Sequence, residues 1–188
     1  LTRGYDTQFR QFLDGITSRR PLPASSDSLF TSYGGELGKI KSLSDEIVYH
    51  PVKYRVLFGS KAESMLQSKF KIVKNPDIVL NDNDIKSRVI SLINQFFALE
   101  NWDFGDKFYF SELSTYVMKE MAPDVVTFLI VPEDASQTFG SLFEIKSEVD
   151  EIFISGATVN DIQIIDAVTA NQIVASGNIA TSVRSGNT

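Results

Sequence analysis

The chain of 188 residues contains no cysteine, only one histidine and no long apolar segment. Without cysteine it can form no disulfide, no thiolate metal site and no cysteine nucleophile. With a single histidine, His50, neither the two-histidine zinc motif nor any multi-histidine metal site can exist. No apolar run approaches the roughly 18 residues that a membrane helix needs. The usual composition signals of a disulfide scaffold, a zinc enzyme and a membrane protein are therefore all missing.

Basic residues are the minority, with 18 Lys and Arg against 24 Asp and Glu, a net charge of −6 and a pI near 4.8. General binders of nucleic acid or of anionic membranes are normally basic, so we expect neither as a partner. The charge is also uneven, at +3 over residues 51–100 and −8 over residues 101–155. These segments could attract each other within a subunit or between copies, or the acidic one could simply be solvated.

Nucleotide-binding and serine-hydrolase motifs are absent as well. The one glycine cluster, Tyr33-Gly34-Gly35-Glu36-Leu37-Gly38, lacks the lysine of a phosphate-binding loop and is typical of a turn. His50 precedes Pro51, without a nucleophile elbow elsewhere, which favours a structural histidine over a catalytic one. Asp82-Asn83-Asp84 begins like a calcium loop but lacks its glycine and its terminal glutamate. We therefore predict no catalytic residue, no cofactor and no metal.

Four carboxylates cluster near a predicted hairpin turn. They are Glu144, Glu148, Asp150 and Glu151. Glycoside hydrolysis needs two carboxylates opposed across a cleft, whereas acids around a turn are usually just exposed.

The N-terminal third is predicted to contain one helix followed by a long loop. Phe9, Phe12, Leu13 and Ile16 lie on one face of a helix over residues 5–16. Gly15 lies near the end of this helix, and the prolines at 21 and 23 cannot continue it. Residues 19–36 are rich in Pro, Ser and Gly and read as a loop, and residues 37–50 as one or two short strands. The loop carries Arg19 and Arg20, which could grip a phosphate but are more often solvated in such a setting.

The remainder is predicted to alternate between strands and helices. We expect strands near 52–58, 68–73, 125–131, 142–145 and 151–154, with 125–131 central because it is apolar on both faces. A short helix to Gln67 precedes the second of these strands. Helices are expected over 82–96, capped by Asn81 or Asp82, and from a capping Ser111 to Pro123.

This order predicts an α+β fold: a small sheet with two helices on one face, preceded by a helix and a long loop and followed by a β tail. We divide the chain into residues 1–47, 48–155 and 156–188, the last forming a hairpin from 161–166 and 172–175 and then a frayed end.

Aromatic residues are concentrated in residues 96–110, which hold seven of the 21 in the chain. Phe108, Tyr109 and Phe110 cannot all point to one face of a strand, since alternate side chains point opposite ways. Something must therefore cover the second face. Either this chain buries these rings in its own core, or another subunit covers them, because aromatics are favoured at interfaces.

The stretch from Val48 to about Ile165 resembles the C-terminal part of the baseplate wedge proteins of T-even-like contractile-tail phages, and more loosely the baseplate J-like family. The resemblance rests on Val48-Tyr49-His50-Pro51-Val52 before an alternating strand, and on Asn81-Asp82-Asn83-Asp84-Ile85-Lys86 before a long helix. Three further stretches continue it: Phe104-Gly105-Asp106-Lys107-Phe108-Tyr109-Phe110-Ser111-Glu112-Leu113, Val125-Val126 and Asp150-Glu151-Ile152-Phe153-Ile154. Residues 17–36 and 59–80 depart from that pattern.

The resemblance implies a structural virion protein rather than an enzyme. Such subunits build a ring around the tail hub, contact copies of themselves and other wedge and hub proteins, and are assembled in the host cytoplasm. The chain begins at Leu1 without an initiator methionine, so we expect a fragment of a longer protein. The resemblance implies that this fragment is the C-terminal part, which in such proteins carries self-association, and we therefore expect a homodimer.

Eight residues are predicted to form the interface of that dimer: Trp102, Phe104, Phe108, Phe110, Ile152, Ile154, Ile162 and Ile164. The strand 162–165 could add to a neighbour's sheet edge. Asp103, Asp106 and Glu112 could face Lys69, Lys71 and Lys74 of another copy. Two rival functions stay open: a tail-associated glycoside hydrolase using Glu144 or Glu151, and a carbohydrate-binding module using the aromatics as a stacking platform.

Overall fold

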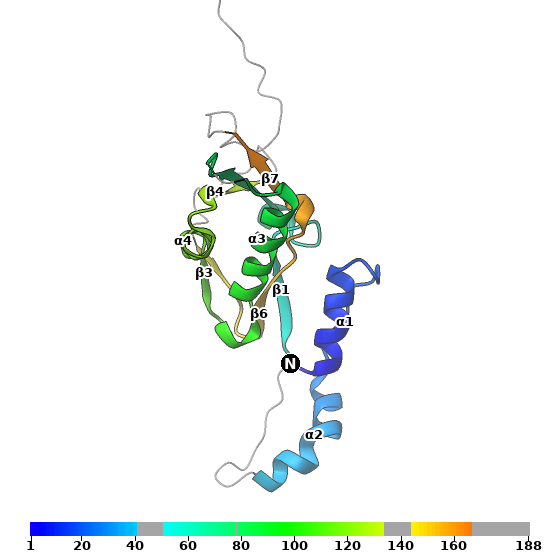
Figure 1. Ribbon diagram of the computed structural model, residues 1–188. Helices are drawn as coiled ribbons and strands as arrows, with labels where there is room; N and C mark the ends of the chain where they lie inside the picture. Colours follow the sequence, from blue (N-terminus) through cyan, green and yellow to red (C-terminus); the bar gives the residue numbers. More distant parts are fainter. Residues whose placement is uncertain (41–50, 78, 134–143, 167–188) are drawn as a thin grey trace, which may run out of the picture. The chain divides into compact units, whose positions relative to one another are not determined.

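The computed structural model describes residues 1–40, 51–77, 79–133 and 144–166 (Figure 1). The α-helices within them are α1 (Arg3–Leu13), α2 (Ser26–Ile40), α3 (Asp82–Phe96) and α4 (Phe110–Met121). The strands are β1 (Lys53–Leu57), β2 (Ser68–Lys74), β3 (Lys107–Tyr109), β4 (Val125–Pro132), β5 (Glu144–Lys146), β6 (Glu151–Ser155) and β7 (Ile162–Ile165). Short 3-10 turns lie at η1 (Ser64–Leu66), η2 (Leu99–Asn101) and η3 (Val159–Asp161).

The α+β class is confirmed, but the described strands form three small sheets rather than one. β4, β2 and β7 make a three-stranded sheet in that order, while β1 pairs with β6 and β3 with β5. β1 ends at Leu57, and the next two residues, Phe58 and Gly59, have φ angles of 65° and 66° that turn the chain away from the strand direction. The chain therefore starts a new sheet with β2 instead of extending the first.

Residue contacts divide the chain into two compact units that interleave along the sequence. Unit 1 comprises Leu1–Val56, Phe97–Lys107 and Lys146–Ile154. Unit 2 comprises Leu57–Phe96, Phe108–Ile145 and Ser155–Thr188. The consecutive division at residues 47 and 155 stays a prediction of the sequence, whereas each compact unit draws on three separated stretches.

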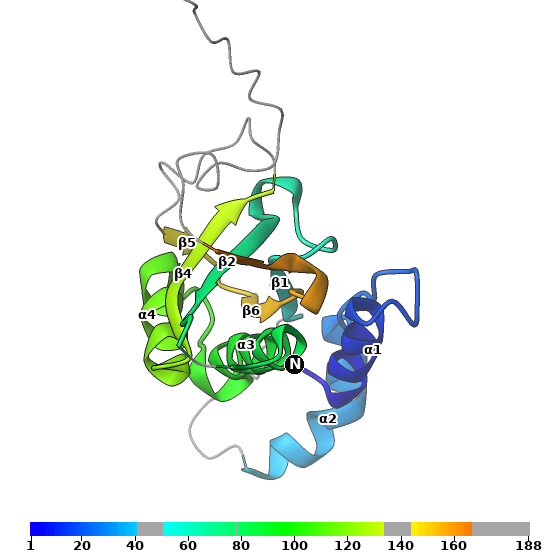
Figure 2. The same cartoon turned by 45° about the horizontal axis from the view of Figure 1, so that its top comes forward.

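Unit 2 is built on β2, with α3 and α4 on the same side of its sheet (Figure 2). β2 runs antiparallel to β4 and parallel to β7. On the helix side, Phe70 and Ile72 of β2 are fully buried. The helices meet them with a buried stripe each, spaced as an amphipathic helix requires. The stripes are Ile85, Val89 and Ile93 on α3, and Phe110, Leu113, Val117 and Met121 on α4.

The strand over 125–131 was predicted to be central, and this is wrong for the sheet as described. β4 lies at an edge and β2 lies between β4 and β7. The sequence of β2 hides its position, because three lysines alternate with its apolar residues. Those lysines are accommodated by partners: Lys69 Nζ lies 2.7 Å from Asp161 Oδ1 and 3.3 Å from Glu133 Oε1. Lys74 pairs with Asp82 at 2.8 Å.

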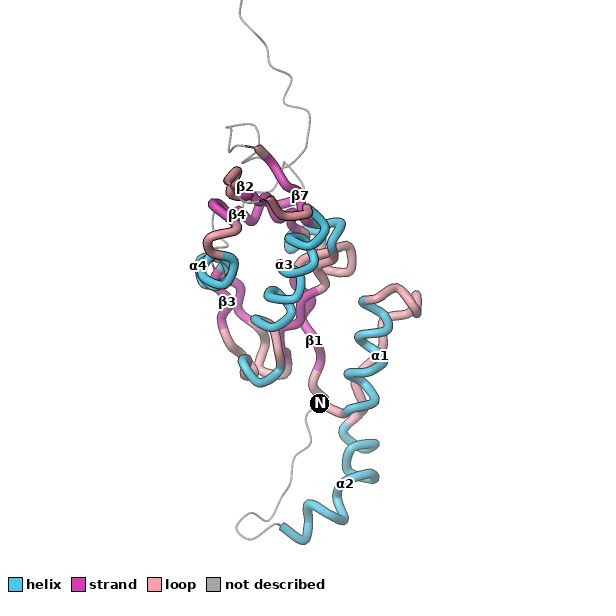
Figure 3. Tube along the Cα trace, viewed as in Figure 1, coloured by secondary structure: helices cyan, strands magenta, loops and turns pink. Residues whose placement is uncertain are grey.

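In unit 1, α1 lies beside β1 (Figure 3), and side chains of α1 and of the loop that follows it contact this strand. The backbone N–H of Tyr54 donates to the hydroxyl of Tyr5 at 3.2 Å, and its carbonyl accepts from Nη2 of Arg20 at 3.0 Å. Tyr5 stacks on Tyr54 with ring centroids 5.6 Å apart, and Phe9 lies 4.9 Å from Tyr54. Both backbone groups of Tyr54 are satisfied, which protects this strand edge from pairing with another chain.

Both ends of α1 carry the capping signals of its sequence. Thr2 precedes the helix, and its hydroxyl accepts from the N–H of Tyr5 at 3.3 Å. At the other end Gly15 has a φ of 74°, and the N–H of Ile16 donates to the carbonyl of Gln11 at 2.9 Å. This is the left-handed glycine cap that ends many helices, and it points the chain into the loop before α2.

The predicted loop over 19–36 is wrong in its second half, because residues 26–36 are part of helix α2. Ser25 caps this helix: its hydroxyl accepts from the N–H of Ser28 at 3.3 Å. The run of Ser, Asp and Gly favours a loop by propensity alone, but Leu29, Tyr33 and Leu37 repeat at helical spacing. Of the strands predicted over 37–50, residues 37–40 are helical instead, and 41–50 lie outside the described residues.

Of the other local predictions, some are confirmed and one is wrong. Asn81 caps α3, since its side chain accepts from the N–H of Asn83 at 2.8 Å. The short turn before β2 is present as η1. Ser111 is not the cap of α4, because the helix already begins at Phe110 and Tyr109 provides no side-chain hydrogen bond. The second strand of the C-terminal hairpin, 172–175, lies outside the described residues.

Candidate functional site

The rings of residues 96–110 are mostly accounted for inside their own units. In unit 1, Phe97 stacks on Trp102 at 5.4 Å, and Trp102 meets Phe153 edge to face at 5.1 Å. In unit 2, Phe108 is fully buried and lies 5.0 Å from Phe110 and 5.9 Å from Phe58. The structure therefore supports the interpretation of these rings as core, with Phe104 as the exception.

The isoleucines predicted for the interface are similarly placed. Ile152 and Ile154 are buried on β6, at 6% and 5% exposure, and Ile162 is buried at 2%. Ile164 is half-buried on β7, which pairs with β2 on one side and forms an edge of the described sheet. Ile152, Ile154 and Ile162 are thus buried within their own chain, and the exposed apolar side chains offer a further candidate interface.

Phe104 is exposed, with 50% of its surface accessible, at the tip of a tight turn before β3. Asp106 fixes this turn by accepting the N–H of Asp103 at 2.7 Å, and Gly105 supplies a φ of 76°. A second turn lies beside it: the N–H of Ser147 donates to the carbonyl of Asp106 at 2.9 Å. That second turn carries Val149, which is 84% exposed. Two neighbouring turns, joined by a hydrogen bond, thus each expose one apolar side chain.

A second apolar surface, which the sequence analysis missed, lies along α2. Phe30, Tyr33 and Leu37 occupy one side of the helix at i, i+3 and i+7. They are 63%, 43% and 40% exposed, respectively. The spacing was a readable signal, but it was obscured by the prediction of a loop across these residues. We refer to Phe30, Tyr33 and Leu37 as the α2 stripe, and to Phe104 and Val149 as the paired tips.

The carboxylates that could have served a hydrolase are engaged as structural partners. Glu151 forms ion pairs with Lys53 at 3.6 Å and Arg55 at 3.2 Å, and it also accepts the N–H of Glu148. Asp150 pairs with Lys53 at 3.6 Å. Glu144 is exposed on β5 in unit 2. Within the described ranges no group of His, Asp and Glu side chains could hold a metal ion. His50 lies outside those ranges.

The lysines expected to pair across copies have partners in their own chain. Lys69 and Lys74 are in the ion pairs described above, and Lys71 is 5% exposed on β2. Burial alone would lower the pKa of Lys69, but its hydrogen bond with Asp161 and the charges of Asp161 and Glu133 raise it. Asp106 is used within its own turn. These contacts stabilise the fold and leave little of this charge for a neighbour.

The most perturbed titratable group belongs to the contact between α1 and β1. Tyr54 is 1% exposed, and its hydroxyl donates to Asp6, which also pairs with Arg10 at 3.1 Å. Burial, followed by the hydrogen bond and charge of Asp6, raises the pKa of the Tyr54 hydroxyl. Burial likewise raises the pKa of Tyr5. Both shifts favour the neutral phenol and fit a structural contact better than proton transfer at pH 7.

Among the helices that the structure describes, none combines the length and hydropathy required to cross a membrane. Comparison of the chain with protein-family models and with curated proteins found no match.

Proposed function

We propose that this chain is a structural subunit that associates with itself, and that it is part of a phage baseplate wedge, assembled in the host cytoplasm and located in the virion baseplate. The observation that carries the self-association is the apolar surface of unit 1. Its α2 stripe and paired tips expose aromatic and branched aliphatic side chains on secondary structure that is already folded. Aromatic and aliphatic side chains on pre-formed elements are the usual anchors of protein interfaces.

The wedge assignment rests on the resemblance of residues 48–165 to the C-terminal part of wedge proteins, and the partners would be further copies and other wedge and hub proteins. Two features of the structure support a structural role over the two rivals. Glu151 is neutralised by two cations instead of facing an open cleft. Trp102 is held between Phe97 and Phe153, so it offers a sugar less surface than a free platform would.

The variant that tests this proposal must disturb the exposed surface and not the core. Phe108→Glu is unsuitable, because Phe108 is fully buried and a charge there would unfold unit 2. Tyr33→Glu with Leu37→Glu places two charges on the α2 stripe without touching the core. Met65→Glu, on η1 of unit 2 at 46% exposure, is the matched control.

We expect analytical ultracentrifugation to show that the double variant of the α2 stripe dissociates to monomer at concentrations where the wild type and Met65→Glu remain associated. Burying two charges in an apolar contact costs several kcal/mol, so the loss should exceed about a hundredfold in the dissociation constant. Equal association of all three proteins would show that the α2 stripe is not the interface. The association of Phe104→Ser, measured in the same way, then tests whether the paired tips form the interface.

A further inference from the structure

A hollow of about 460 Å³, with both polar and apolar walls, opens where α1 ends and the chain turns toward α2, and neither the core nor the proposed interface uses it. Its polar walls come from Gln8 and Gln11 of α1 and from Thr17, Arg19 and Arg20 of the following loop. All of these residues belong to unit 1. The volume lies within the range of small-molecule sites, which is about 300–1,000 Å³.

The polar groups around this hollow are largely without partners. Within the described ranges the side chains of Gln8, Gln11 and Arg19 form no hydrogen bond or ion pair. Thr17 Oγ1 is buried and has no partner there either. Gln8, Gln11 and Arg19 are exposed and can be hydrated, whereas the hydroxyl of Thr17 is buried, and folded proteins rarely leave a buried polar group without a partner. The hollow therefore offers several hydrogen bonds that the protein itself does not fill.

Arg20 is held in place by its other contacts. Its Nη2 donates to the carbonyl of Tyr54, and its guanidinium lies 5.6 Å from the centre of the Phe9 ring. The glycine cap at Gly15 fixes the path of the loop that carries it. A guanidinium anchored in this way keeps further N–H groups in a set position, so little ordering is required when a ligand binds.

The charge of the walls selects an anion. Two guanidinium groups line the hollow and no carboxylate does. The C-terminal end of α1 opposes an anion, but its dipole amounts to only about half a negative charge, less than one of the two arginines. Arginine forks match carboxylate and phosphate oxygens in paired hydrogen bonds, and glutamine amides can add single ones.

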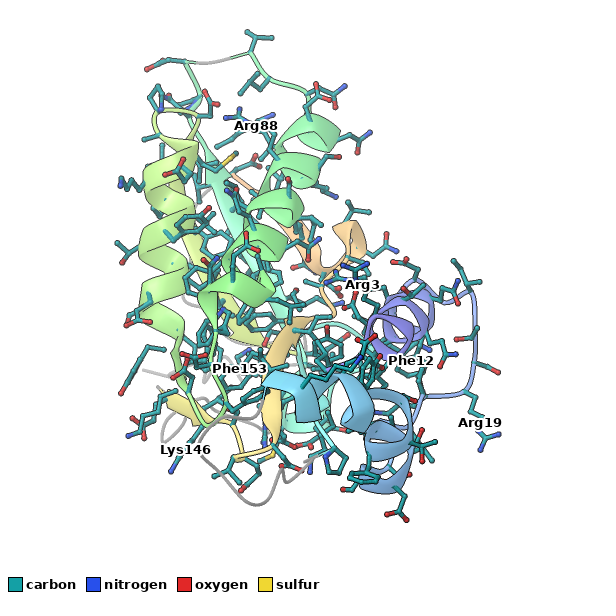
Figure 4. The ribbon with its side chains drawn as sticks, turned by 90° about the horizontal axis from the view of Figure 1, so that it is seen from below. Arg3, Phe12, Arg19, Arg88, Lys146 and Phe153 are labelled. Atoms are coloured by element: carbon teal, nitrogen blue, oxygen red, sulfur yellow. The ribbon has the colours of Figure 1, made fainter. Side chains whose placement is uncertain are left out.

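We propose that this hollow binds a small ligand bearing carboxylate or phosphate groups, held by Arg19 and Arg20 with the amides of Gln8 and Gln11. Arg19 projects from the loop in Figure 4, and with no partner to break it can turn over the bound anion. Arg20 forms the fixed part of the site and Arg19 the adaptable part. The proposal does not depend on self-association of the chain.

The test is a titration of the full chain with inorganic phosphate and, separately, with citrate, at constant ionic strength. NMR follows the side-chain amide signals of Gln8 and Gln11 and the Nε–H signals of the arginines. We expect saturable shifts at these groups with at least one of the two anions. Saturation by phosphate alone or by citrate alone identifies which oxyanion the site prefers.

Two variants separate a built site from general attraction of anions. Arg19→Gln should weaken the affinity at least tenfold, since one of two guanidinium groups is lost. Arg3→Gln removes the same charge at the far end of α1 and should leave the affinity unchanged (Figure 4). Arg19 is exposed, so backbone amide spectra should show both variants folded. Shifts that rise linearly with both anions, or an unchanged affinity in Arg19→Gln, would overturn the proposal.

Discussion

At the scale of single residues, the hydroxyl of Tyr54 ties β1 to α1 through Asp6. Because its pKa is raised in the folded state, the neutral phenol is favoured by folding. The stability it contributes is complete below about pH 10, where the unfolded tyrosine titrates, and is lost as the pH rises beyond that toward the folded pKa. The raised pKa values of Tyr5 and Lys69 act in the same direction.

Tyr54→Phe should therefore cost about 1–2 kcal/mol at pH 8, since a buried hydrogen bond is lost, and the difference from the wild type should shrink above pH 10. Urea denaturation between pH 8 and pH 11 measures this. Tyr5 and Lys69 are present in both proteins, so their effect cancels in the comparison. A difference that stays constant or widens with rising pH would contradict the assigned role of the hydroxyl.

Thr17 provides a second test at this scale, because its buried hydroxyl has no partner among the described residues. Thr17→Val replaces that hydroxyl with a methyl group of similar size, and we expect a gain of about 1 kcal/mol in unfolding free energy. Thr7→Val is the control: its hydroxyl is exposed and donates to the carbonyl of Arg3, and its loss should change stability by less than about 0.5 kcal/mol. A destabilised Thr17→Val would mean that the hydroxyl is paired in solution.

At the scale of elements, three glycines differ in their φ angle and in the space available for a Cβ atom. Gly4 lies in α1 with an ordinary negative φ, and a Cβ added there would meet open space. Gly15 has the same open space but a φ of 74°. Gly59 has a φ of 66°, and a Cβ there would lie 1.9 Å from the carbonyl oxygen of Gly156. A backbone oxygen cannot move aside as a flexible side chain can, so the three positions should rank clearly.

We expect Gly4→Ala to stabilise the protein by up to about 1 kcal/mol and Gly15→Ala to cost about 1 kcal/mol. Gly59→Ala should cost more than about 3 kcal/mol, because strain and a backbone clash add. Thermal and chemical denaturation of the three variants gives the ranking directly. An equal effect at Gly15 and Gly4 would show that the left-handed cap does not end α1 as described.

The same scale shows what the sequence could predict. α1, α3 and α4 were predictable because their apolar residues repeat at helical spacing and because capping residues, such as Asn81 before α3, mark where a helix begins or ends. α2 was missed because Gly34, Gly35 and Gly38 argue for a turn by propensity, while its apolar residues serve an exposed surface instead of a core. The central place of β2 was hidden because its lysines find distant partners, such as Asp161 for Lys69, which no local pattern reveals.

At the scale of the whole molecule, the chain builds two units from alternating stretches of sequence. A linear division therefore could not predict them, since residues 97–107 and 146–154 join the N-terminal helices in unit 1. The interface predicted from the sequence also differs from the apolar surface that the structure exposes. Phe108 and Ile154 were chosen for their hydrophobicity, but tertiary packing decides which apolar residues are buried. Of the eight predicted interface residues, Phe104 is the clearly exposed one.

The central claim is that the chain assembles with itself, and the most direct test is its mass in solution. Light scattering should be recorded on the wild type from low micromolar to near-millimolar concentration. We predict a mass that rises from one copy to a dimer or larger, because the exposed apolar side chains of unit 1 become buried. A stable dimer would bury more than about 2,000 Å² in total. A mass of one copy, 21.0 kDa, at every concentration would contradict self-association by this chain.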